Sequence, residues 1–124
     1  MILLCLTPAY GQWQYIGTWG SGANQTKVYL RDPQYDEHGS PTMWVKHVPT
    51  NRKAFLERFP GPRNFGWFIE RVSINCSQKL IEKKQTVVYS AKGKMLAATS
   101  LPPIAVDILP GSLGQLFLNG ACSR

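Results

Sequence analysis

Short stretches of alternating apolar and polar residues, each closed by glycine or proline, run through most of this chain of 124 residues. In residues 26–32, Val28 and Leu30 fall on one parity, whereas Tyr29 and Arg31 fall on the other. A period of two is the pattern of a strand with one buried face. The 11 glycines and 9 prolines are typical of many turns and few long helices. The chain is therefore predicted to form an antiparallel sheet of short strands.

Six segments are predicted to be strands. They are residues 13–17, 26–32, 42–48, 65–76, 80–90 and 94–99. A turn at residues 91–93 joins the last two as a hairpin, and residues 36–40 form another turn. We expect Pro102-Pro103 to end the sheet region.

Residues 50–64 break the strand pattern. They allow one helical turn around residues 53–58, which Pro60 and Pro62 would stop. We expect this segment to be a protruding basic connection.

The end of the chain predicts a helix. Ser112 can cap its first turn, and Leu113, Leu116 and Phe117 fall on one helical face. Gly120 is the expected end. The predicted fold class is α+β: about six antiparallel strands with one C-terminal helix packed on the sheet.

The first 11 residues have features of an export signal. Residues 1–6 are apolar, and Ala9 and Gly11 are spaced like the small residues of a signal-peptidase site. We expect residues 1–11 to be the remnant of a signal peptide and residues 12–124 to form a single domain. The alternative is a short apolar N-terminal strand.

Cleavage after Gly11 would remove Cys5 and leave two cysteines, Cys76 and Cys122. An even pair in a small exported domain predicts one disulfide, and two free thiols in a cytosolic protein are the alternative. No apolar run reaches the roughly 18 residues of a membrane span, so we expect no transmembrane segment. Export predicts the periplasm or the outer cell surface.

The sequence offers little for metal or cofactor chemistry. His38 and His47 lie on different predicted elements, and no phosphate-binding glycine motif is present. We predict no metal site, no cofactor and no catalytic residue. A small basic nuclease-like hydrolase that uses His47 stays an alternative.

Positive charge is concentrated in the middle of the chain. The formal net charge is +7, and residues 46–84 contain nine basic and three acidic residues. Basic residues with interleaved aromatics are typical of a binding surface, and a solvated loop with its phenylalanines in the core is the alternative. The candidate binding residues are Arg52, Lys53, Phe55, Arg58, Phe59, Arg63, Trp67 and Arg71.

Several short motifs occur in a characteristic order. They are Trp13-x-x-Ile16, Trp44-Val45-Lys46, Ser73-Ile74-Asn75-Cys76, Tyr89-x-x-x-Gly93, Pro110-Gly111-Ser112 and Ala121-Cys122. This set resembles the surface-adhesin protein E-like family of small exported bacterial proteins. The resemblance implies a six-stranded antiparallel sheet whose C-terminal helix is tethered by a disulfide. The founding member is an outer-membrane lipoprotein adhesin that binds host matrix proteins and haem and can dimerise. Only the cysteines carry over from it as matched residues.

The function predicted from the sequence is that of an exported, non-enzymatic binding module that contacts host or envelope proteins. A structural component of the periplasm or envelope is the second hypothesis, and the hydrolase is the third. The expected partner is a protein or an acidic surface ligand, with a homodimer allowed and no nucleic acid expected. For haem, His38 and His47 would be the only imidazole ligands.

Overall fold

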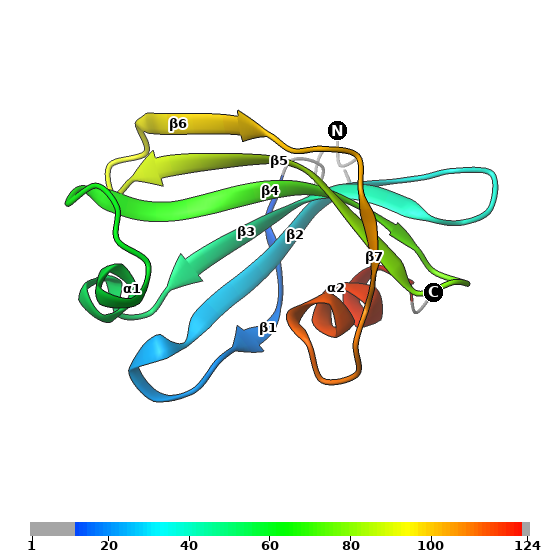
Figure 1. Ribbon diagram of the computed structural model, residues 1–124, viewed down its shortest axis with the longest axis horizontal. Coiled ribbons are helices and arrows are strands. Elements are labelled where there is room, and N and C mark those ends of the chain that lie inside the picture. The colour runs from blue at the N-terminus through cyan, green and yellow to red at the C-terminus, as the bar shows by residue number, and fades with distance from the viewer. Residues whose placement is uncertain (1–11, 123–124) are drawn as a thin grey trace, which may run out of the picture.

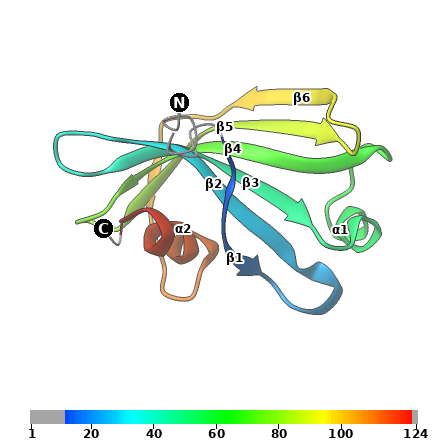
Figure 2. The same cartoon turned by 180° about the vertical axis from the view of Figure 1, so that it is seen from behind.

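The described part of the chain folds into one curled antiparallel sheet with two α-helices on the same side (Figures 1 and 2). This computed structural model describes residues 12–122. The strands are β1 (Gln14–Trp19), β2 (Thr26–Tyr35), β3 (Pro41–Pro49), β4 (Phe65–Asn75), β5 (Leu80–Ser90), β6 (Met95–Ser100) and β7 (Ala105–Asp107). The helices are α1 (Arg52–Arg58), α2 (Leu113–Cys122) and a 3₁₀ turn, η2 (Gly22–Asn24).

Strands β1 to β6 follow one another across the sheet in chain order, so each pairs with its neighbours in sequence. The predicted alternation of apolar and polar residues decides which side chains are buried on one face of the sheet. Val28 and Leu30 of β2 are buried, and so are Met43 and Val45 of β3. Together with β4 and β5 they form a concave apolar face, which both helices cover in part. The predicted fold class is thus confirmed.

Helix α2 supplies the core of the concave face. Phe117, Leu118 and Ala121 are buried in the same cluster as the apolar residues of β2 to β5. The Oγ of Ser112 accepts a hydrogen bond from the backbone N–H of Gln115 at 3.3 Å, which confirms the predicted cap. The helix continues two residues past the predicted end at Gly120 and includes Cys122.

A glycine lets α2 approach the sheet closely. A Cβ atom added at Gly120 would lie 3.2 Å from the side chain of Ile16 in β1 and 3.3 Å from that of Leu30 in β2. These distances are tighter than ordinary van der Waals contact, so the absent side chain brings the helix against the strands. Gly120 is therefore a packing residue within the helix and does not end it.

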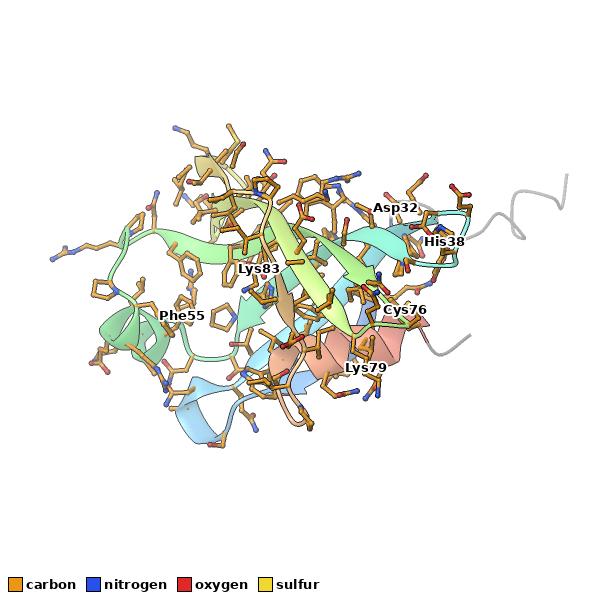
Figure 3. The ribbon with its side chains drawn as sticks, turned by 45° about the vertical axis from the view of Figure 1, so that its right-hand side comes forward. Asp32, His38, Phe55, Cys76, Lys79 and Lys83 are labelled. Atoms are coloured by element: carbon orange, nitrogen blue, oxygen red, sulfur yellow. A yellow bond between two sulfur atoms is a disulfide. The ribbon has the colours of Figure 1, made fainter. Side chains whose placement is uncertain are left out.

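Cys76 follows β4 and forms a disulfide with Cys122 at the end of α2, with a Cα–Cα distance of 5.8 Å. The predicted pairing is confirmed. The bridge fixes the C-terminal end of α2 to one end of the sheet. In Figure 3, Cys76 lies at that end, and Phe55 of α1 lies at the opposite end.

Two predictions about strand boundaries were wrong. The sheet does not end at Pro102-Pro103, because residues 105–107 form β7. Strand β6 pairs with residues 85–89 of β5 and leaves residues 80–82 of β5 to pair with β7. Strand β2 also continues past Asp32-Pro33, since a bulge between Arg31 and Gln34 takes up both residues. Asp32 has a φ of 53°, and a bulge does not need the N–H that proline lacks.

The middle segment contains a full helix, α1, where one turn was expected. The Oδ1 of Asn51 accepts from the N–H of Ala54 at 3.0 Å and caps it. Residues 1–11, with the predicted signal remnant and Cys5, lie outside the described residues. None of the helices from residue 12 to residue 122 is long and apolar enough to cross a membrane.

The disulfide is expected to contribute much of the stability. Loop closure over 46 residues predicts that a Cys76→Ser/Cys122→Ser variant loses about 4 kcal/mol of unfolding free energy. Urea unfolding of the variant beside the wild type measures this loss. A loss below about 1 kcal/mol would mean that α2 is held by apolar packing alone.

Candidate binding pocket

A pocket of about 690 Å³ opens on the concave face, at the end of the sheet that α2 leaves uncovered. Its floor is formed by β3, β4 and β5. Its walls are formed by the β1–β2 loop with the strand ends that flank it, by α1 with the loop that follows it, and by the first residue of α2. The floor residues are His47, Phe65, Phe68, Thr86 and Val88. The wall residues are Trp19, Gly20, Ser21, Asn24, Thr26, Phe55, Leu56, Arg58, Phe59, Pro60, Gly61, Pro62 and Leu113. This volume is in the range of pockets that take a small organic molecule.

Aromatic packing holds α1 over the pocket. The Phe55 ring stacks on that of Phe65 with centroids 5.1 Å apart and lies 6.2 Å from that of Phe68. Phe59 follows at 5.1 Å from Phe55 but is 55 % exposed at the rim. Pro60 then stops further helix. The helix is therefore fixed to the sheet by one aromatic residue, while a second stays accessible.

A hydrogen-bonded histidine–glutamate pair lies buried in the floor. His47 Nε2 and Glu70 Oε1 are 2.9 Å apart, and the two residues are only 2 % and 5 % exposed. The His47 ring stacks on Phe68 at 4.4 Å and meets the Phe117 ring edge to face at 5.8 Å. Lys83 Nζ reaches Glu70 Oε2 at 3.5 Å from β5. Both carboxylate oxygens of Glu70 thus have a cationic or N–H partner.

The environment of Glu70 favours its ionised form. Burial alone raises the pKa of this carboxyl. The hydrogen bond and charge of His47, followed by the charge and hydrogen bond of Lys83, outweigh burial and lower the pKa below its ordinary value. Glu70 is therefore a carboxylate at neutral pH, held at the boundary between core and pocket.

The rim of the pocket carries one basic side chain. Arg58, in the last turn of α1, lines the pocket, and its guanidinium carbon lies 5.6 Å from the centroid of Phe59. An apolar cavity with an arginine at its mouth suits a molecule that has an apolar body and an acidic group. The lining of the pocket thus fits such an amphiphile.

The predicted binding residues do not form one surface. Phe55, Arg58 and Phe59 line the pocket. Arg52, Lys53 and Arg63 do not line it, and Arg52 Nη1 instead donates to the carbonyl of Phe65 at 3.4 Å. Trp67 and Arg71 lie on the opposite, convex face, because their parity in β4 is opposite to that of Phe68 and Glu70. The candidate binding residues between 52 and 71 are therefore divided between the two sides of the sheet.

The two histidines lie far apart. His38 is in the β2–β3 turn, where its backbone N–H and the backbone N–H of Ser40 donate to Oδ1 of Asp36. These hydrogen bonds, from Ser40 first and His38 second, lower the pKa of Asp36. Within residues 12–122, no three His, Cys, Asp or Glu side chains gather as a metal site would require.

Sequence reasoning missed Glu70 as a site residue. Glu70 shares the parity of the apolar residues Phe68, Val72 and Ile74 in β4, and a charge at a buried position is a signal of a paired site. Four other lining residues could not be distinguished by sequence from ordinary core residues. They are Trp19, Thr86, Val88 and Leu113. They come together only through the fold.

The comparisons with known proteins found no matching family model, no matching curated protein and no matching solved structure.

Acid should destabilise this protein in part through Glu70. A pKa lowered by folding means that ionised Glu70 contributes stability above its unfolded pKa of about 4.3, and that this contribution is lost as pH falls through the lower folded value. A Glu70→Gln variant should be less stable by about 1–3 kcal/mol at pH 7. It should also lose less stability than the wild type between pH 6 and pH 3. Parallel stability–pH curves for the two proteins would contradict this account.

Proposed function

We propose that this chain is an exported, non-enzymatic binding module that takes an amphiphile into the concave pocket. The ligand, whether free or part of a partner's surface, has an apolar body and an acidic group. Its body would lie on Phe55, Phe59 and Phe68, and its acidic group beside Arg58. The observation that carries the proposal is the pocket of about 690 Å³ with aromatic walls and an arginine at its rim.

Exposure at the rim supports a binding role. Phe59 is a large apolar side chain that remains 55 % exposed next to a preformed cavity. Apolar and arginine side chains beside a cavity are typical anchors of recognition. The pocket mouth also lies in the most basic part of the chain, which favours an acidic ligand.

Two further features agree with export and binding. Disulfides persist in oxidising compartments and are rare in the cytosol, so the Cys76–Cys122 bridge favours a secreted or periplasmic protein. A binding role is also what the resemblance to the surface-adhesin protein E-like family implies. The family assignment and adhesion to host proteins stay predictions.

The test uses the fluorescent probe 8-anilinonaphthalene-1-sulfonate, which has an apolar body and one anionic group. An Arg58→Gln/Phe59→Ser variant should bind the probe at least about tenfold more weakly than the wild type, because it loses both the charge and an apolar wall. Fluorescence titration measures the dissociation constant.

The matched control is Arg63→Gln/Met95→Ser. It removes the same charge and a similarly exposed apolar side chain (Met95 is 59 % exposed), and neither residue lines the pocket. Its affinity should stay within about twofold of the wild type. Equal loss in both variants, or no saturable binding by the wild-type protein, would refute the pocket as the site.

A second candidate function, acid–base hydrolysis, is favoured by one observation. His47 lies at the pocket floor and is hydrogen-bonded to a second titratable group, Glu70, as a general base with its orienting carboxylate would be. Against it, Nε2 of His47 is already engaged by Glu70, and the pair is almost wholly buried. The arrangement therefore supports a structural role for the pair more strongly than a catalytic one.

Hydrolysis is tested with a fluorogenic RNA oligonucleotide and a fluorogenic ester. The binding-module proposal predicts no turnover by the wild type above a heat-denatured sample. Turnover that a His47→Gln variant lacks, while it remains folded by circular dichroism, would instead establish the hydrolase.

A further inference from the structure

The convex face of the sheet carries a second, independent feature. A one-layer sheet normally presents polar residues to solvent on its uncovered side. Here both α-helices lie on the concave side (Figures 1 and 2), yet the other side carries three of the four tryptophans of the chain. They are Trp13, Trp44 and Trp67, accompanied by Tyr15, Tyr29 and Tyr89.

Basic side chains lie between these rings in a regular arrangement. Arg31, Trp44 and Arg71 are direct partners across β2, β3 and β4. Two residues further along the strands, in the direction of Trp67, Tyr29 is the direct partner of Lys46. Arg31 and Arg71 are two strands apart, so the strand spacing places their Cα atoms about 10 Å from each other, with Trp44 on the strand between them.

Cation–π contacts fix the cations in place. The guanidinium of Arg31 lies 4.4 Å from the centroid of Trp13, and that of Arg71 lies 5.4 Å from the centroid of Trp44. Lys46 Nζ is 4.8 Å from Trp67 and 5.6 Å from Trp13. These residues are all partly buried. Side chains held in this way lose less conformational entropy when an anion binds.

The positive charge of this face is not balanced. Burial first, and the charge of Arg31 second, lower the pKa of Lys46. Two carboxylates lie at the margin of this face. Asp32 Oδ2 is 3.5 Å from Arg31 Nε, and Glu82 Oε2 is 3.4 Å from Lys84 Nζ. Lys46 and Arg71 instead contact aromatic rings, those of Trp67 and Trp44.

We infer that the convex face binds an acidic polysaccharide. We call this the convex cationic face and define it by Arg31, Lys46, Arg71, Trp13, Trp44 and Trp67. Carboxylate or sulfate groups of the glycan would pair with the three cations, since guanidinium forks match such anions. The indoles would hold these cations in place through the cation–π contacts.

A glycan fits better than a nucleic acid for two reasons on this face. Single-stranded nucleic acid is bound largely by bases stacking on open aromatic rings, but Lys46 and Arg31 already lie over Trp13, and Lys46 over Trp67. The disulfide also favours a compartment outside the cytosol, away from most of the cell's nucleic acid. The inference does not depend on the concave pocket.

The experiment measures binding of the full chain to a heparin oligosaccharide by calorimetry. A Lys46→Gln/Arg71→Gln variant should bind at least about tenfold more weakly than the wild type. Lys53→Gln/Arg63→Gln, which removes the same charge from the exposed region around α1, should stay within about twofold. A charge-conserving Lys46→Arg/Arg71→Lys variant should recover part of the affinity and shows whether loss reflects charge or unfolding.

Single-stranded DNA of equal charge and phosphatidylglycerol vesicles are the competing probes. Tighter binding to DNA than to heparin would replace the glycan with a nucleic acid and overturn the inference, as would binding to vesicles alone. Equal weakening in both Gln variants would mean that net charge and not this face attracts the glycan. Unchanged binding of 8-anilinonaphthalene-1-sulfonate by Lys46→Gln/Arg71→Gln keeps this test separate from that of the pocket.

Discussion

The attachment of α2 to one end of the concave face is the constraint on which the rest of the structure depends. The Cys76–Cys122 disulfide fixes the C-terminus of the helix beside the end of β4. Ten helical residues span about 15 Å, whereas the eleven residues of β4 or β5 span about 36 Å. One helix therefore covers less than half the length of the face. The remainder is left to α1 and the loops, which close over it only partly and leave the pocket.

The His47–Glu70 pair lies at the boundary between these two halves. Phe117 of α2 makes a T-shaped contact with the imidazole, and Phe68 stacks on its face. A buried carboxylate without partners would be strongly destabilising, but His47 and Lys83 occupy both of its oxygens. The pair thus allows polar atoms beneath an apolar cavity. Together with Lys83, it also links β3, β4 and β5 below the cavity.

Much of this fold could be predicted from the sequence, because the signals are local. The alternation in β2, the Ser112 cap and the Cys76–Cys122 pairing each follow from residues close together or from cysteine arithmetic. The site could not be predicted in the same way. The contact of His47 with Glu70 depends on the β3–β4 register across 23 residues of sequence, and the same register divides one basic aromatic segment between two faces. Strand β7 depends on the unequal lengths of β5 and β6, which no local pattern reveals.

The two faces of one sheet thus differ in chemistry: the concave side offers an apolar pocket, and the convex side offers ordered cations. The most direct test of the pocket as the ligand site is a ¹H–¹⁵N correlation titration of the wild-type chain with 8-anilinonaphthalene-1-sulfonate. We predict shift changes at backbone amides that surround the pocket, such as those of Trp19, Leu56, Thr86 and Val88, and none at Trp44 or Arg71 on the other face. Shift changes that gather on the convex face, or spread evenly over the chain, would contradict this account.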